Sequence, residues 1–224
     1  MTEAEWLGCD DPLEMLDFLR SRSPVSDRKE RLFACGCCRR IWHLLKDPRS
    51  RDAVEAAESY VDGCFDGLAM SAVAAEADAA IGDVSLMSQA AEHAAVAAAQ
   101  ASSLVHMGRA AEAAAVAAGD ALSPENWLQA KWDEQVLQSD MLRCVFGNPF
   151  RPVSIAPVWL VWNDGTVHRV AQAIYDERAF DRMPILADAL EDAGCTNQAI
   201  LDHCRQPGEH VRGCWVVDLL LGKS

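Results

Sequence analysis

An alanine-rich stretch in the middle of the chain restricts the fold more than any other sequence feature. Between Ala69 and Ala121 the chain holds 23 alanines. Alanine has the highest helix propensity of all residues because its side chain loses no entropy in a helix, and its small size lets helices approach closely. Large apolar residues do not recur in this stretch at the a and d spacing of a coiled coil. We therefore expect one or two long helices there.

Signals for helix starts and helix faces occur on both sides of this stretch. Thr2 with Glu5 and Asp11 with Glu14 have the spacing of capping boxes. Three prolines stand directly after residues that cap helices, as first-turn prolines do: Pro12, Pro48 and Pro124. Two later segments carry apolar residues at helical spacing, namely Leu128, Trp132, Val136, Leu142 and Phe146, and then Val167, Val170, Ala171, Ile174 and Tyr175. The sequence thus predicts an all-α protein.

A run rich in glycine and proline divides the chain. It begins with GNPFRP at 147–152 and is followed by Pro157, and neither a helix nor a central strand tolerates this composition. We expect a helical N-terminal body at 1–146, a linker at 147–157 and a compact helical unit at 158–224.

One short β element is a candidate near 153–162. The apolar residues Val158 to Trp162 precede a turn of sequence Asn-Asp-Gly at 163–165, which is the usual context of a short strand. The chain becomes helical again from Pro184, and a last helix is expected from about Cys214 to Leu221.

Net charge and cysteine usage narrow the class of protein. The formal charge of −14 repels nucleic-acid backbones and anionic lipid. Nine cysteines, an odd number without framework spacing, favour a reducing compartment over a secreted disulfide scaffold. The first five residues are acidic rather than basic, no apolar signal region follows, and no apolar stretch is long enough to cross a bilayer. We expect a soluble cytoplasmic protein with no membrane partner.

One segment carries the opposite charge. Between Arg20 and Arg51 ten basic residues face three acidic ones, a local charge of +7, whereas the other ten basic residues face 31 acidic ones, a charge of −21. Such a segment can form a nucleic-acid face or pack against the carboxylates of its own chain. No aromatic-rich or glycine-rich binding motif accompanies it, so we expect intramolecular packing and no nucleic-acid partner.

Three segments of the chain resemble a known family. They are FACGCCRRIWHLL at 33–45, FGNPFRPV at 146–153, and the C-terminal part from IYDERAFDRMPILADALEDAGC to HVRGCWVVDLLLGK at 174–223. These segments are similar to an uncharacterised protein family that is abundant in planctomycete-type bacteria. The resemblance covers nearly the whole chain except its alanine-rich middle. It implies no activity, cofactor or catalytic residue.

The cysteines at 35, 37 and 38 are close enough in sequence to raise a redox or metal hypothesis. Cys37 and Cys38 each fall on an apolar line of the predicted helix, together with Ile41. Adjacent helical residues point about 100° apart, which makes the pair poor ligands for one ion. We interpret these thiols as small apolar residues of the core.

A second cluster lies near the C-terminus. Five soft ligands occur within twenty residues: Cys195, His203, Cys204, His210 and Cys214. Their density resembles a zinc site, but the spacing matches no standard C-x2-C or H-x3-H pattern, and Cys204 lies on an apolar stripe with Ile200. Convergence requires the loop after the predicted helix to fold back, which Gly208 and Gly213 permit. We predict that this cluster holds no metal and no cofactor, with zinc as the alternative.

Asp218 is the one carboxylate in the apolar run 215–221. A helix that is apolar around its circumference is buried, so this carboxylate needs a basic or hydrogen-bonding partner. We interpret Asp218 as part of a structural ion pair rather than as a catalytic acid with a shifted pKa.

Templates of common enzymes are missing from the sequence. We find no Walker loop, no G-x-G-x-x-G after a strand, no G-x-S-x-G elbow and no H-E-x-x-H. We therefore predict a non-catalytic protein-interaction or scaffolding module whose partner is a protein, and homo-oligomer formation stays open. The alternatives are a zinc-binding protein that uses the C-terminal Cys/His cluster, and an enzyme whose site is assembled from distant residues.

Overall fold

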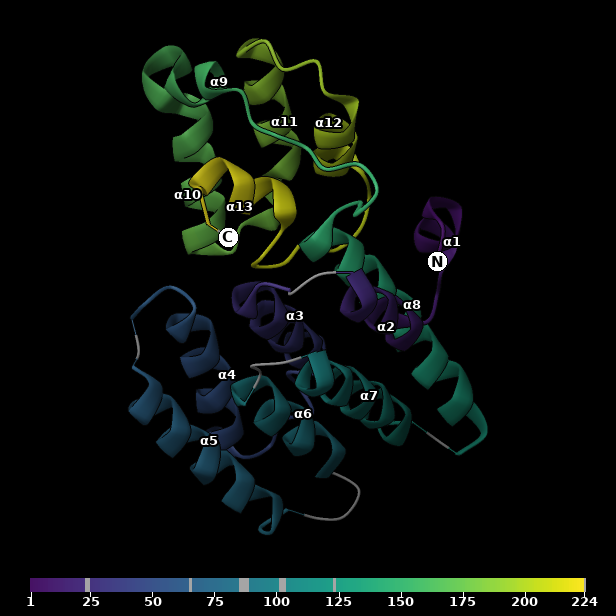
Figure 1. The fold of residues 1–224 in the computed structure, drawn as a ribbon. Coiled ribbons are helices and arrows are strands. Elements are labelled where there is room, and N and C mark those ends of the chain that lie inside the picture. The colour runs from purple at the N-terminus through teal and green to yellow at the C-terminus, as the bar shows by residue number, and fades with distance from the viewer. Residues whose placement is uncertain (23–24, 65, 85–88, 101–103, 123, 224) are drawn as a thin grey trace. The chain divides into compact units, whose positions relative to one another are not determined.

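A computed structural model describes the chain except for residues 23–24, 65, 85–88, 101–103, 123 and 224. Within the described residues the chain forms helices and no strand, which confirms the predicted all-α class (Figure 1). Two compact units are present, Met1–Leu142 and Arg143–Ser224. The division falls inside a helix, so the glycine- and proline-rich stretch at 147–157 lies within the second unit.

None of the helices in the described part of the chain is both long enough and apolar enough to cross a membrane.

The described residues of the first unit form seven helices and most of an eighth. Their bounds are α1 Glu3–Gly8, α2 Pro12–Arg22, α3 Asp27–Arg40, α4 Pro48–Tyr60, α5 Gly67–Ile81, α6 Gln89–Ala99, α7 Leu104–Asp120, a 3-10 turn at Pro124–Asn126, and α8 Trp127–Phe146, which continues into the second unit. Two of the predicted starts are confirmed by hydrogen bonds, while the residue before Pro124 lies outside the described residues. Thr2 and Glu5 form a capping box, and the Asp47 carboxylate caps α4 with Pro48 in its first turn.

The alanine-rich stretch forms three helices, so the prediction of one or two long helices was wrong. Gly82 ends α5, and the boundary between α6 and α7 lies partly outside the described residues. Helices α6 and α7 pack on each other and on α3. Fully buried alanines fill these contacts, among them Ala94, Ala95, Ala98, Ala110, Ala111, Ala114 and Ala115. High helix propensity sets where a helix can form, but its length depends on how many turns can be buried.

The basic segment packs on the chain's own carboxylates, as predicted. Bonds from arginine nitrogens to carboxylate oxygens measure 2.6 to 3.0 Å in the pairs Arg20–Asp17, Arg28–Asp62, Arg39–Glu58, Arg40–Glu134, Arg49–Asp47 and Arg49–Asp83. Arg31 is buried and donates instead to the carbonyl oxygens of Ala98 and Ala99, where it caps the C-terminal end of α6. Much of the positive charge of this segment is therefore neutralised within the first unit.

The cysteines of α3 lie in the core of the first unit. Cys35, Cys37 and Cys38 are each at most 1% exposed. Burial raises the pKa of all three thiols well above the ordinary value, so they stay protonated at neutral pH. The interpretation of these thiols as small apolar core residues is confirmed.

The described part of the second unit, up to residue 223, holds the end of α8 and five further helices. Their bounds are α9 Pro157–Val161, α10 Thr166–Glu177, α11 Met183–Asp192, α12 Gln198–Arg205 and α13 Trp215–Leu221, with 3-10 turns at Trp162–Gly165 and Phe180–Arg182. Helices α10 to α13 enclose an apolar core that includes Ile174, Leu186, Leu190, Ile200 and Val216. On α13, Asp218 is 1% exposed and has at least one interaction partner.

The β candidate near 153–162 does not form a strand. Residues Pro157–Val161 are helix α9, because Pro157 occupies a first-turn position after the extended residue Ala156. An apolar run this short has too little periodicity to indicate whether it forms a strand or a helix. The turn after it is present, since Asn163 and Asp164 both have positive φ angles.

Candidate metal centre

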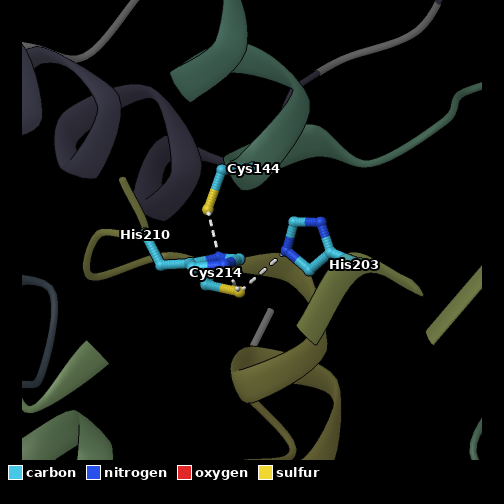
Figure 2. Close-up of side chains that lie close together, drawn as sticks. All are labelled: Cys144, His203, His210 and Cys214. Atoms are coloured by element: carbon cyan, nitrogen blue, oxygen red, sulfur yellow. Dashed lines mark hydrogen bonds between the residues drawn. The ribbon is translucent and has the colours of Figure 1, made fainter. Parts of the chain in front are cut away.

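Four buried side chains of the second unit place soft ligand atoms close together. Cys144, His203, His210 and Cys214 offer two sulfurs and two imidazole nitrogens, all within 4.8 Å of one another. Figure 2 shows the Cys144 thiol and the two imidazole rings converging around the Cys214 sulfur. Each residue is at most 8% exposed. The group therefore has the composition and compactness of a Cys2His2 site.

Three of the four ligands come from one helix–loop–helix segment. His203 lies in the last turn of α12, His210 in the loop that follows, and Cys214 directly before α13. The loop folds back on itself, with positive φ angles of 140° at Gly208 and 91° at Gly213. Both glycines thus provide the reversal that convergence of these ligands requires.

The fourth ligand comes from a distant part of the chain. Cys144 lies in the last turn of α8, and α8 ends when Gly147 takes a φ angle of 67° and donates its N–H to the carbonyl oxygen of Arg143. A Cβ atom at Gly147 would lie 3.2 Å from the Trp215 ring. Only glycine allows this close approach without displacement, and it places the last turn of α8 beside the start of α13.

Three of the distances between ligand atoms are close to those of a tetrahedral ion. With Zn–S near 2.3 Å and Zn–N near 2.0 Å, the ligand atoms of a tetrahedral zinc site lie roughly 3.3–3.8 Å from one another. Here Cys144 Sγ is 3.5 Å from His210 Nδ1, and Cys214 Sγ is 3.2 Å from His203 Nε2 and 4.0 Å from His210 Nδ1. Shifts of a few tenths of an ångström would bring these three distances to the tetrahedral values.

The two thiols differ in their readiness to ionise. Burial raises the pKa of Cys214, but hydrogen bonds with Cys144, His203 and His210 and the charge interaction with His203 act in the opposite direction and hold this pKa well below the usual range. The hydrogen bond with Cys214, together with burial, raises the pKa of Cys144 well above it. Cys214 is thus the more acidic of the two thiols.

Two residues of the predicted cluster lie outside this group. Cys195 and Cys204 are buried in the apolar core of the second unit, and burial raises the pKa of both thiols. Cys204 faces the core, as its apolar stripe indicated. The structure therefore brings together three of the five predicted ligands. It adds Cys144, which sequence reasoning missed because 59 positions separate this residue from His203.

Aromatic and amide groups surround the histidines. The His203 and His210 rings meet edge to face with centroids 4.8 Å apart, and the Trp215 ring lies 5.2 Å from the His203 ring. The other ring nitrogen of His203, Nδ1, is 3.2 Å from the side-chain amide of Gln206. These contacts restrict the orientation of His203 even without an ion.

No protein-family model matches the chain, and neither a curated protein nor a solved structure matches it. The resemblance of the segments at 33–45, 146–153 and 174–223 therefore stays a prediction.

Proposed function

We propose that the second unit binds one zinc ion through Cys144, His203, His210 and Cys214, and that the chain is a zinc-binding protein. The observation that carries this proposal is the mutual approach, within 4.8 Å, of two sulfurs and two imidazole nitrogens in buried positions. Thiolate and imidazole are the ligands that zinc prefers in structural sites. Two thiolates also neutralise Zn²⁺, so a buried site of this composition carries no net charge.

The proposed role of the ion is structural. Four protein ligands fill the tetrahedral coordination of zinc and leave no position for water or substrate, unlike the three-ligand sites of zinc enzymes. The ligands also come from three separate places: the end of α8, the end of α12 with its loop, and the start of α13. An ion held by all four would cross-link these segments and contribute its binding free energy to the folding of the second unit. This role agrees with the non-catalytic function that the sequence predicts.

The proposal replaces the sequence-based prediction that the C-terminal cluster holds no metal. That prediction counted Cys195 and Cys204 among the ligands, and their burial in the apolar core leaves only three. Cys144 supplies the fourth ligand, and with it the set is sufficient for a closed zinc site.

Elemental analysis of the full chain tests the proposal. Protein purified without chelator or a metal-affinity tag should contain about one zinc per chain, and Cys144→Ser and Cys214→Ser should each lose it. Replacement of zinc by Co²⁺ should give the visible spectrum of a tetrahedral ion with thiolate ligands.

The matched control is Cys195→Ser, which removes a buried thiol of the same unit outside the ligand group. This variant should keep its zinc. The proposal would be refuted if the purified wild type contained no zinc and also took up no added Zn²⁺. It would also be refuted by a Cys144→Ser variant that binds zinc as tightly as the wild type.

A further inference from the structure

The contact between Gln206 and His203 points to a residue that controls the proposed metal site without binding the ion. Gln206 follows the last residue of α12 and lies three positions after His203. Its side-chain amide is 3.2 Å from His203 Nδ1, while His203 Nε2 is 3.2 Å from Cys214 Sγ. Each ring nitrogen therefore has its own partner, and only Nε2 is directed at the sulfurs.

Metal binding would fix which ring nitrogen carries the proton. A histidine that ligates through Nε2 must be neutral and must carry its single proton on Nδ1. That N–H then needs an acceptor, and metal-bound histidines almost always donate to a carboxylate, a carbonyl group or water. A half-turn of the Gln206 amide places its oxygen where the nitrogen now lies, with no change in the backbone.

We propose that Gln206 is a positioning residue of the zinc site: its side-chain oxygen accepts the Nδ1 proton of His203 and thereby holds His203 in the tautomer and orientation that present Nε2 to the ion. This inference rests on the proposed zinc site. Neutral histidine exists as two tautomers, and the one with the proton on Nε2 cannot bind the ion through that atom. With its oxygen turned toward Nδ1, the Gln206 amide stabilises the other tautomer, which leaves Nε2 free for the ion.

The position of Gln206 on the surface makes the role testable with little risk to folding. Gln206 is exposed, whereas His203 is 7% exposed. Substitution at 206 therefore removes a polar contact to a buried ring without leaving a hole in the core. Loss of such an outer contact typically weakens metal binding by about 10- to 100-fold. Water can reach this exposed position and replace part of the contact, so we expect the lower end of that range.

The experiment compares Gln206→Met, Gln206→Glu and the control Gln198→Met in the full chain. Methionine matches glutamine in length but accepts no strong hydrogen bond, and glutamate supplies a stronger acceptor. Gln198 is exposed in the first turn of α12 and remote in sequence from the loop. Zinc affinity is measured at neutral pH by competition with a chromophoric chelator. Long-range ¹H–¹⁵N NMR reports which nitrogen of His203 is protonated.

We expect Gln206→Met to bind zinc about 10-fold more weakly than the wild type. Gln206→Glu should bind at least as tightly as the wild type, Gln198→Met should be unchanged, and the NMR spectra of the zinc-bound wild type should show His203 protonated on Nδ1. If wild-type protein binds zinc and Gln206→Met binds it equally well, the role of Gln206 is refuted and the zinc site stands. If the wild type binds no zinc, both proposals fall together.

Discussion

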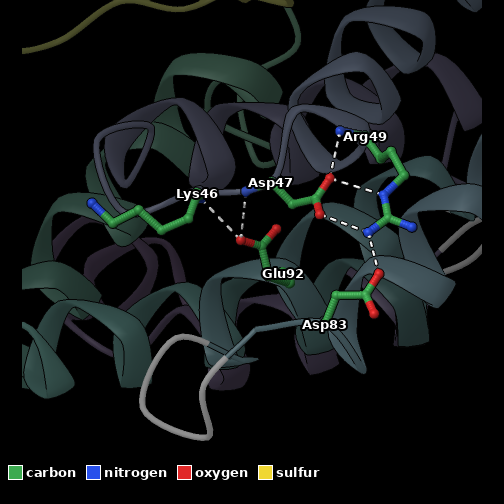
Figure 3. A network of polar contacts seen from close by, with 5 residues as sticks. All are labelled: Lys46, Asp47, Arg49, Asp83 and Glu92. Atoms are coloured by element: carbon green, nitrogen blue, oxygen red, sulfur yellow. Dashed lines mark hydrogen bonds and ion pairs between the residues drawn. The ribbon is translucent and has the colours of Figure 1, made fainter.

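The buried carboxylate of Glu92 binds the backbone at the start of α4, and its substitution tests how much this contact stabilises the first unit. This residue of α6 is fully buried, and one oxygen of its carboxylate accepts the backbone N–H groups of Lys46 and Asp47 at 3.0 and 3.3 Å (Figure 3). Its other oxygen, Oε2, has no hydrogen-bond partner among the described residues. Asp47 in turn caps α4 and pairs with Arg49. Glu92 therefore satisfies two part-buried backbone donors at the start of α4.

Removal of this carboxylate should cost several kcal/mol. Glu92→Ala leaves two part-buried N–H groups without their acceptor, at the lower end of about 1–3 kcal/mol each, and it removes two buried methylene groups at about 0.8 kcal/mol each. The loss of a desolvated charge offsets part of this cost. We expect Glu92→Ala to lower the free energy of unfolding by about 3–5 kcal/mol. Glu92→Gln keeps the accepting oxygen, so its cost should be nearer 1 kcal/mol.

Urea denaturation, followed by tryptophan fluorescence and circular dichroism, measures these differences. The matched control is Glu76→Ala on α5, an exposed glutamate with no ion pair among the described residues, which should change stability by less than about 0.5 kcal/mol. Should Glu92→Ala prove within about 1 kcal/mol of the wild type, the two N–H groups do not depend on this carboxylate and the reasoning fails.

Two further sites in the first unit, Ser139 and the Arg40–Glu134 pair, have different expected responses to substitution. Ser139 is fully buried, and its hydroxyl has no hydrogen-bond partner among the described residues. Ser139→Ala should therefore leave the free energy of unfolding unchanged or raise it by up to about 1 kcal/mol, as measured by thermal denaturation. A clear loss of stability would show that the hydroxyl has a partner. Arg40 and Glu134 form a two-bond ion pair at 2.9 and 3.1 Å with side chains 13% and 8% exposed. Replacing either by methionine should cost about 3–5 kcal/mol, whereas the double substitution should cost much less than the sum; additive costs in this double-mutant cycle would contradict the pairing.

Helix starts were predictable from sequence because they depend on chemistry within one turn. The capping box at Thr2 and Glu5 requires only that two side chains and two backbone N–H groups lie three residues apart. The same holds for Asp47 followed by Pro48, where a side-chain acceptor and a fixed φ angle act on adjacent residues. No distant residue has to be known for either signal.

Helix lengths and short elements were less predictable, because distant contacts decide them. The alanine-rich stretch has helix propensity throughout, yet α6 stops after Ala99, where Arg31 of α3 binds the carbonyl oxygens of its last turn. A partner 68 positions away thus takes part in ending this helix. At Pro157–Val161, five residues carry too little pattern to decide between helix and strand.

The candidate site contains three ligands that local sequence signals could predict and one that depends on a distant contact. His203, His210 and Cys214 lie within twelve residues, and the folded-back loop between them could be foreseen from Gly208 and Gly213. Three ligands alone are insufficient for a closed zinc site, and the nearby thiols of Cys195 and Cys204 are directed into the core.

The missing ligand had to come from elsewhere in the chain, and only packing could identify it. Cys144 lies three residues before Gly147, and Gly147 has a positive φ angle and would bring a Cβ atom to within 3.2 Å of the Trp215 ring. The sequence indicates that Gly147 ends a helix, but it does not indicate which other helix packs against that end. Because Trp215 directly follows Cys214, the residue that packs on Gly147 is also the neighbour of a ligand. The contact that ends α8 and the contact that completes the proposed zinc site are therefore parts of the same packing arrangement.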